Sequence, residues 1–221
     1  MPTAPPARRR GRQAEAERND RLLLDAARAA FAVQGADAPV SAIAARAGVG
    51  IGSLYRRYPT KEALLQHLCV LAMEQAIAAA TVALEAEDAW SGLTGYVRDC
   101  VENHTGALAP VAGTIAVTPA MLRTSRRGMR LAETLVDRAQ AAGVLRRDVS
   151  TLDISLLIEQ FSRRSTTLPA AEEDNARERL LAIALDGLRA SNADALPGRP
   201  PSRAAYVRRW DVSNSPSSRS S

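Results

Sequence analysis

Two tyrosines, three basic side chains and two glycines are concentrated in the segment GIGSLYRRYPTK, between Gly50 and Lys61. Phenol, guanidinium and ammonium groups donate hydrogen bonds to phosphate oxygens, and such contacts fix register on nucleic acid without reading its sequence. Ile51 could contact a thymine methyl group, and Ser53 could serve base edges as donor or acceptor. Glycines at positions 50 and 52 would let the backbone approach DNA closely. The segment therefore predicts a surface that contacts DNA.

The same side chains also have ordinary structural interpretations. Tyr55 could be a core residue, and we expect part of its ring to be buried even if its hydroxyl meets a phosphate. Arg56 and Arg57 could form a solvated helix face. The distribution of charge and the spacing of the surrounding helices must therefore decide between the two interpretations.

Charge is unevenly distributed along the 221 residues. Residues 1–61 carry 11 basic and 5 acidic side chains, so the net charge of +5 lies entirely in the first part of the chain. This asymmetry indicates a nucleic-acid-facing end joined to a body with another role. A basic disordered tail is the alternative, because the arginines at positions 8, 9, 10 and 12 supply much of the excess.

Composition predicts an all-α protein, since alanine and leucine are abundant while aromatic residues make up only 4% of the chain. Periodicity and stop signals predict three helices over residues 18–35, 39–48 and 51–58. Ala44, Gly48 and Leu54 occupy the small, turn and buried positions that a helix-turn-helix requires, at spacings of four and six residues.

Longer helices are expected in the remainder of the chain. Thr60 can cap a helix of some two dozen residues, and Ser150 with Asp153 forms a capping box. Further helices are predicted over 89–103 and 119–142, and a last one begins at Pro169, where the acidic run 172–174 suits the N-terminal helix dipole.

The segment LLLDAARAAFAVQGADAPVSAIAARAGVGIGSLYRRYPTKEALL, from Leu22 to Leu65, closely resembles the DNA-binding domain of the tetracycline-repressor (TetR) family of bacterial regulators. The resemblance implies a three-helix DNA-binding domain with a helix-turn-helix, followed by a larger helical domain for ligand binding and dimerisation. The expected division is a disordered basic tail over 1–17, a DNA-binding domain over 18–61, a ligand-binding and dimerisation domain over 62–190, and a disordered tail over 191–221.

The resemblance also implies which residues contact DNA. Gly50 to Tyr58 would be the recognition segment, and Lys61 would approach the DNA backbone at the start of the fourth helix. Pro39 stands where many members have a threonine or serine that caps the second helix, so Ser41 would have to supply that phosphate contact. The expected DNA-binding residues are Ser41, Gly50, Ile51, Gly52, Ser53, Tyr55, Arg56, Arg57, Tyr58 and Lys61.

A pocket for a small molecule and a dimer surface are implied in the same way. Tyr96 and His104 are the preferred residues to orient a ligand, although any of the candidates could be ordinary core. The pocket candidates are Met73, Trp90, Tyr96, Cys100, His104, Val111, Ile115, Met121, Leu122 and Met129. The candidates for a dimer seam in the last two helices are Leu156, Leu157, Phe161, Leu181, Leu185 and Leu188.

No catalytic, metal or cofactor motif is present in the sequence, so an enzyme is not expected. Cys100 and His104 could meet as a nucleophile pair, but two core residues are the ordinary interpretation. No apolar run long enough to span a bilayer is present, and the two cysteines suit a reducing cytoplasm.

The predicted function is a homodimeric repressor that binds a pseudo-palindromic operator and is released by a small apolar molecule. The alternative is a DNA-binding regulator or activator whose body binds a protein partner, and an enzyme that kept the fold is a third class.

Overall fold

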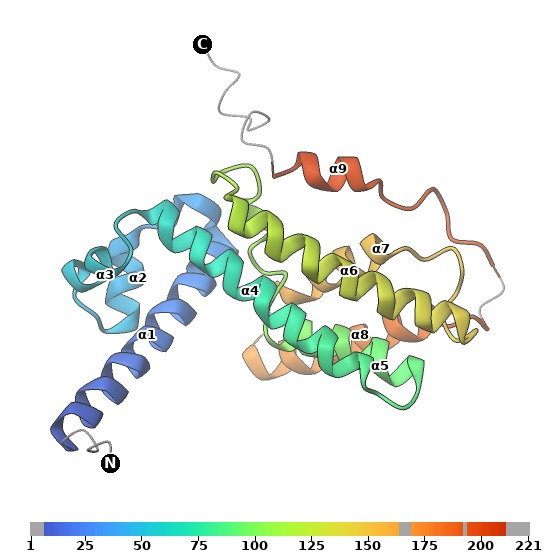
Figure 1. The fold of residues 1–221 in the computed structure, drawn as a ribbon, viewed down its shortest axis with the longest axis horizontal. Coiled ribbons are helices and arrows are strands. Elements are labelled where there is room, and N and C mark those ends of the chain that lie inside the picture. The colour runs from blue at the N-terminus through green and yellow to red at the C-terminus, as the bar shows by residue number, and fades with distance from the viewer. Residues whose placement is uncertain (1–6, 164–168, 192–193, 211–221) are drawn as a thin grey trace, which may run out of the picture.

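The computed structural model describes residues 7–163, 169–191 and 194–210, and these residues form helices and no strand (Figure 1). The all-α prediction is therefore confirmed. The elements, in chain order, are α1 (Ala7–Gln34), η1 (Gly35–Asp37), α2 (Val40–Ala47), α3 (Ile51–Arg57), α4 (Lys61–Leu84), α5 (Ala89–Glu102), η2 (Ala109–Val111), α6 (Pro119–Ala141), α7 (Thr151–Ser162), α8 (Ala170–Gly187) and α9 (Arg203–Arg208).

Figure 1 shows α2 and α3 at one end of the molecule, with α4 leading from them into a body made of α5 to α8. Helix α4 packs against both α5 and α6, and α5 also packs against α7. Its length and composition are those of a membrane-spanning helix, but its apolar side chains enter the protein's own cores. Helix α4 is thus a core element that joins the two ends of the molecule.

The helix-end signals predicted from the sequence lie at helix ends in the structure. Gly48 ends α2 with a φ of 68°, a left-handed conformation that glycine adopts without steric cost. The Thr60 hydroxyl accepts a hydrogen bond from the backbone N–H of Ala63 at 3.0 Å and caps α4. Ser150 and Asp153 form the expected capping box at the start of α7.

Both tails differ from the expectation of disorder. Helix α1 begins at Ala7, within the supposed tail 1–17, because, apart from Gly11, residues 7–17 are alanine, arginine, glutamine and glutamate, which favour helices. In the supposed tail 191–221, residues 203–208 form α9, and the side chain of Trp210 packs against a hydrophobic core. Residues 1–6 and 211–221 lie outside the described part of the chain.

Two hydrophobic cores hold the described helices together. The first core joins α1, α2, α3 and the start of α4 to the segment 108–121, through residues such as Phe31, Leu54, Leu68 and Val111. The second core lies among α4 to α8 in the body. Because the first core contains residues of the segment 108–121 as well as of α1 to α4, the helix-turn-helix packs directly against the body.

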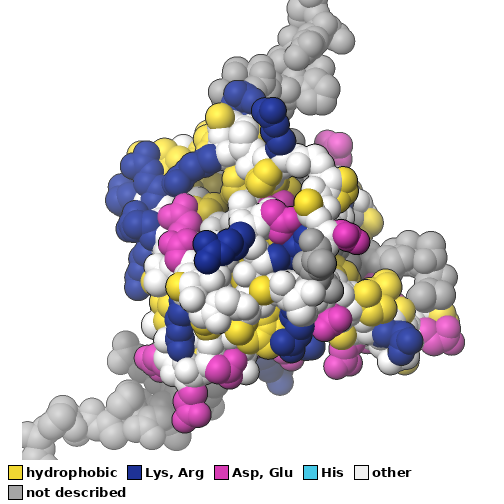
Figure 2. All heavy atoms as spheres, turned by 90° about the vertical axis from the view of Figure 1, so that its right-hand side faces the viewer, with side chains coloured by type: hydrophobic (Ala, Val, Ile, Leu, Met, Phe, Trp, Pro, Cys, Tyr) yellow, Lys and Arg dark blue, Asp and Glu magenta, His cyan; other side chains and the backbone are white. Residues whose placement is uncertain are grey.

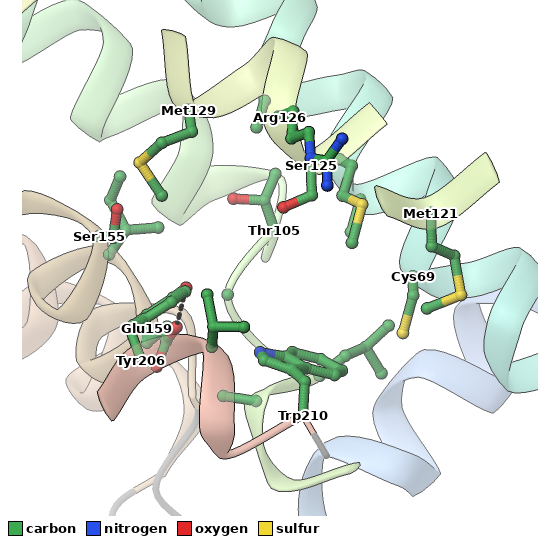
Figure 3. Close-up of a pocket in the computed structure, with 18 of the residues that line it drawn as sticks. Cys69, Thr105, Met121, Ser125, Arg126, Met129, Ser155, Glu159, Tyr206 and Trp210 are labelled. Atoms are coloured by element: carbon green, nitrogen blue, oxygen red, sulfur yellow. Dashed lines mark hydrogen bonds between the residues drawn. The ribbon is translucent and has the colours of Figure 1, made fainter. Parts of the chain in front are cut away.

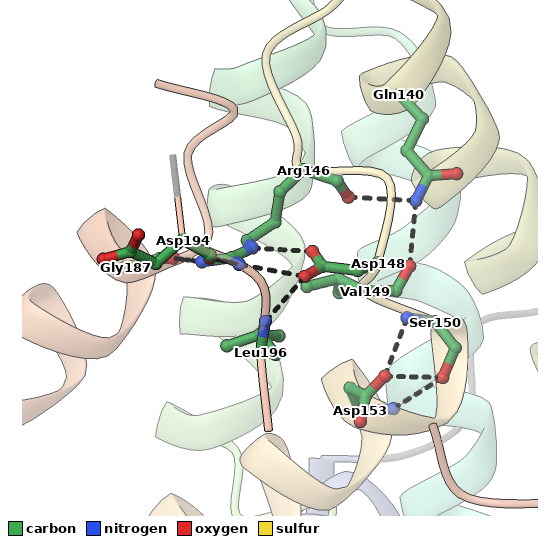
Figure 4. A network of polar contacts seen from close by, with 9 residues as sticks. All are labelled: Gln140, Arg146, Asp148, Val149, Ser150, Asp153, Gly187, Asp194 and Leu196. Atoms are coloured by element: carbon green, nitrogen blue, oxygen red, sulfur yellow. Dashed lines mark hydrogen bonds and ion pairs between the residues drawn. The ribbon is translucent and has the colours of Figure 1, made fainter. Parts of the chain in front are cut away.

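A polar network fixes the connection between α6 and α7 to the chain after α8 (Figure 4). The Arg146 guanidinium donates to both carboxylate oxygens of Asp148, at 2.7 and 2.9 Å, and to the backbone carbonyls of Gly187 and Asp194. The hydrogen bonds from Arg146 hold the pKa of the Asp148 carboxyl group well below its usual range. Asp148 also accepts from the backbone N–H of Leu196, so this ion pair anchors the segment that leads to α9.

Two glycines on α5 provide a matched test of the packing between α4 and α5. A Cβ atom at Gly92 would lie 2.6 Å from the carbonyl oxygen of Ala83, whereas a Cβ atom at Gly95 would meet no atom within 4 Å. We expect Gly92→Ala to lower the free energy of unfolding by about 1–3 kcal/mol through overpacking. Gly95→Ala should raise it by about 0.4–1 kcal/mol. Chemical denaturation followed by circular dichroism measures both, and equal effects would contradict the close helix packing.

Candidate DNA-binding surface and ligand pocket

Helix α3 presents one face to the core and the other to solvent. Leu54 is fully buried, while Ile51 and Tyr55, one helical turn apart, are 46% and 43% exposed. The Ser53 hydroxyl lies on the exposed side and accepts a hydrogen bond from Arg56 at 3.3 Å. The structure therefore brings Ile51, Ser53, Tyr55 and Arg56 together on one accessible surface.

The remaining expected DNA-binding residues lie around this surface with different surroundings. Arg57 is ion-paired with Asp20 of α1, and Ser41 is exposed in the first turn of α2. Tyr58 is only 6% exposed and its ring centroid lies 5.3 Å from that of His67, so its ring belongs to the core. Lys61 is half-buried at the start of α4.

Neither Gly50, which precedes α3 as its N-cap, nor Gly52, which lies within α3, is required by the fold. Gly50 and Gly52 are exposed, both have φ outside the left-handed region, and a Cβ atom at either position would meet no atom within 4 Å. A glycine inside a helix is about 1 kcal/mol less favourable than alanine. Because there is no side chain at these positions, another molecule could approach the backbone closely there.

A pocket of about 500 Å³ lies in the body, bounded by α4, α5, α6, α7, α9 and the segment 105–109 (Figure 3). This volume is in the range of drug-sized ligands. Met73, Met121 and Met129 supply adaptable apolar walls, and Thr105, Ser125 and Ser155 supply hydroxyl groups. Arg126 and Glu159 are charged groups of its lining.

The structure brings some of the predicted pocket residues together and not others. Met73, Tyr96, Met121, Leu122 and Met129 line the cavity. The other five do not: Trp90 stacks with Arg189, Cys100 is buried in the second core, Val111 and Ile115 are buried in the first core, and the Nδ1 atom of His104 lies 3.1 Å from the Ser162 carbonyl oxygen.

The buried thiol and phenol groups are neutral at physiological pH. Burial raises the pKa of Cys69 to about 12 and that of Cys100 to about 11, and it raises the pKa of Tyr96 well above its ordinary value. A thiol must ionise to act as a nucleophile, so these cysteines are unreactive packing residues. Among the described residues, no group of three or more histidine, cysteine or carboxylate side chains could hold a metal ion.

The chain after α8 forms one wall of the pocket. Tyr206, Val207 and Trp210 line the cavity, and Figure 3 shows the Tyr206 hydroxyl bonded to Glu159. This hydrogen bond is 2.8 Å long, and the guanidinium of Arg209 forms a two-pronged ion pair with the same carboxylate. Arg209 also stacks on the Tyr206 ring at 4.0 Å. A single carboxylate on α7 therefore holds this wall in place.

The segment between η2 and α6 is fixed to the first turns of α4. The backbone N–H of Ala116 donates to Glu62 at 2.7 Å, and the Ala116 carbonyl accepts from the Gln66 side chain at 2.9 Å. Leu108 and Met121, which flank this segment, line the pocket and also belong to the first core. The pocket and the DNA-binding helices are thus in contact through residues 108–121.

The candidates for a dimer seam divide between two faces. Leu181 and Leu185 are buried in the protomer's own second core, and Leu157, Phe161 and Leu188 are half-buried against it. Leu156 is half-buried on α7. On α8 the exposed apolar side chains are instead Leu180 and Ile183, at 55% and 60%. The expected seam residues Leu181 and Leu185 therefore face the protomer's own core, whereas Leu180 and Ile183 are the large apolar residues left exposed on α8.

Sequence reasoning missed several residues of the site. Ser125 and Arg126 lie on α6 one turn from Met121 and Met129, a spacing that could have placed them on the same face. Glu159, Tyr206 and Trp210 left no such signal, because their approach depends on the tertiary path of the chain after α8.

Two family models match the chain. Residues 23–68 match bacterial regulatory proteins of the tetR family, and residues 86–190 match the C-terminal domain of SbtR-like transcriptional regulators. A comparison with curated proteins gave no match. Helix α9 lies beyond both matched ranges.

Solved structures with similar folds include two bacterial TetR regulators. One from Mycobacterium vanbaalenii is 28% identical over 80% of this chain and 98% of its own, with a TM-score of 0.54. SCO0520 from Streptomyces coelicolor is 26% identical over 79% of this chain and 99% of its own, with a TM-score of 0.53. LfrR from Mycobacterium smegmatis, solved with proflavine, shares the fold at 20% identity and a TM-score of 0.54, covering 81% of this chain and 99% of its own.

Replacement of Glu159 by alanine tests how the pocket wall is held. A Trp90→Phe background leaves Trp210 as the single tryptophan. Loss of the bonds to Tyr206 and Arg209 should lower the free energy of opening of this wall by about 1.5–3 kcal/mol, the value of a hydrogen bond to a charged group. Acrylamide quenching of Trp210 fluorescence should then rise. The control Glu133→Ala breaks only the exposed pair with Arg203 and should change quenching little. Equal quenching in both variants would contradict the role of Glu159.

Proposed function

Because the chain belongs to the tetR family of bacterial regulatory proteins, we propose that it is a ligand-responsive repressor that binds a pseudo-palindromic operator as a homodimer. The observation that carries this proposal is the outward face of α3, where Ile51, Ser53, Tyr55 and Arg56 are accessible while Leu54 anchors the helix. The protein would act in the cytoplasm, on the nucleoid.

The chemistry of this face favours DNA-backbone contact with limited direct readout. The Tyr55 hydroxyl and the Arg56 guanidinium are phosphate donors, and Ile51 and Ser53 are short enough to reach base edges. Arg57 is engaged with Asp20, so Arg56 is the arginine of α3 that is available to guanine or phosphate. With one such side chain per recognition helix, we expect DNA shape to contribute to specificity.

A homodimer would place two α3 helices in successive major grooves. We propose that α7 and α8 form the interface, with Leu180 and Ile183 of α8 as apolar contacts, because both are large and exposed. Figure 2 views the molecule from the end of the body away from α3 and shows hydrophobic side chains exposed between charged ones. Pairing through one face of the body would leave α3 free in both subunits.

Release by a ligand would follow from contact between the pocket and the first core. A molecule that binds beside Leu108 and Met121 favours whichever arrangement of residues 108–121 it contacts better. The hydrogen bonds between the Ala116 backbone and the side chains of Glu62 and Gln66 would couple that arrangement to the start of α4. The proposed effector is a small, largely apolar molecule.

The alternative function is a regulator whose body binds a protein partner instead of a small molecule. The pocket of about 500 Å³ favours the ligand-responsive function, since a lining of methionines and hydroxyls suits a small ligand. Operator release by a purified compound would support the first function. Operator affinity that responds to a protein partner and to no compound would support the alternative.

The DNA-binding proposal is tested by footprinting of the DNA beside the protein's own gene, followed by affinity measurements on the protected site. Tyr55→Phe removes a phosphate donor and should weaken binding to specific and random duplexes alike, by about tenfold. Ser53→Ala should instead reduce the preference for the specific duplex by about 1 kcal/mol.

Fluorescence anisotropy at several salt concentrations measures both effects. Ser91→Ala, which changes an exposed serine in α5 of the body, is the control and should leave binding unchanged. If Tyr55→Phe and Ser53→Ala also leave affinity and its salt dependence unchanged, the assignment of α3 to the DNA groove is wrong.

A further inference from the structure

Among the described residues, one cation of the pocket lining has no carboxylate partner. Glu159 is ion-paired with Arg209 and accepts a hydrogen bond from the Tyr206 hydroxyl, and Arg203 is paired with Glu133 at 3.3 Å. Arg126 lines the same cavity, and no carboxylate among the described residues pairs with it. The net charge that the lining offers to a ligand is therefore positive.

The position of Arg126 on α6 directs it to the cavity. Leu122, Arg126 and Met129 follow one another at helical spacing and all line the pocket, beside the second row formed by Met121 and Ser125. Figure 3 shows Arg126 and Ser125 next to each other between Met129 and Met121. A guanidinium and a hydroxyl group thus lie together within an otherwise apolar wall.

The helix that carries Arg126 strengthens this positive field. Arg123, Arg127 and Arg130 are exposed on the same helix, as is Arg126 itself at the mouth of the pocket, and this helix has no acidic residue before Glu133. Figure 2 shows basic side chains gathered along one margin of the body. A charged cleft with low-dielectric walls raises the local concentration of counter-ions and disfavours ions of its own sign.

We propose that the pocket binds an amphipathic anion, with its anionic head group at Arg126 and Ser125 and its apolar body between the three methionines and Trp210. This assignment rests on the proposed function, because it names the chemical class of the effector. A guanidinium pairs with a carboxylate or a phosphate-type oxyanion through charge-assisted hydrogen bonds, and both head groups share this chemistry. Glu159 would not repel the head group, since its charge is already compensated.

The test compares three probes that share one alkyl chain and differ in head-group charge: decanoate, decyl phosphate and decyltrimethylammonium, with 1-decanol as the neutral reference. Each is titrated below its micelle concentration into the full chain carrying Trp90→Phe, and binding is read from the fluorescence of Trp210, which lines the pocket. The two anions should bind at least tenfold more tightly than the cation. Their order identifies the preferred oxyanion.

Arg126→Gln should weaken binding of the preferred anion about tenfold and leave 1-decanol binding unchanged, while Arg126→Lys should retain most of the anion affinity. Arg127→Gln is the matched control for the general field of α6: it removes the same charge from an exposed position that does not line the pocket, so it should weaken anion binding far less than Arg126→Gln. Circular dichroism confirms that each variant is folded.

Three results would overturn the proposal: equal binding of anion and cation, an equal loss in Arg126→Gln and Arg127→Gln, or binding of none of the four probes. These titrations contain no DNA, so their failure is separate from that of the proposed function. If the anion binds as expected but leaves operator affinity unchanged, the repressor mechanism fails and the ligand class stands.

Discussion

The DNA-binding helices and the body share one hydrophobic core, and the rest of the structure depends on this packing. Leu54 of α3 and Leu64 of α4 are buried in the same cluster as Val111, Ile115 and Met121 of the body. Each such side chain contributes about 1.5–3 kcal/mol when it is buried. Because protein interiors are close-packed, a shift of the body segment is felt at α3. The orientation of the recognition helix is therefore set by the body as well as by the helix-turn-helix.

Three parts of the protein with different chemistry are arranged around this shared core: the exposed face of α3, the pocket, and the chain after α8 that closes the pocket. Only Leu54 of the α3 side chains is buried, and in the proposed function the exposed donors and glycines of this helix would meet DNA. The pocket keeps polar groups in an apolar wall, and Leu108 and Met121 belong both to that wall and to the core below α3. The chain after α8 closes the pocket through polar bonds to Glu159, which are easier to open than an apolar seam.

The sequence predicts most of the helices, because their signals are local, whereas the expected DNA-contact residues come from the family resemblance and stay a prediction. Gly48, Thr60 and Ser150 act through neighbouring residues, so their roles as helix ends could be predicted. The pocket was only partly predictable: His104 and Trp90 have suitable chemistry, but tertiary packing turns them to Ser162 and Arg189. The wall formed by Tyr206 and Trp210 could not be predicted, since a Pro-, Ser- and Arg-rich composition indicates disorder unless a distant partner is known.

The central claim is that pocket occupancy and DNA binding are linked through residues 108–121. The most direct test is calorimetric titration of the preferred decyl anion into the free protein and into the protein saturated with its operator duplex. We expect weaker anion binding in the operator complex, by the same factor by which the anion lowers operator affinity, as linkage requires. Equal anion affinity in the two states would show that pocket and DNA surface are independent, and it would contradict the account.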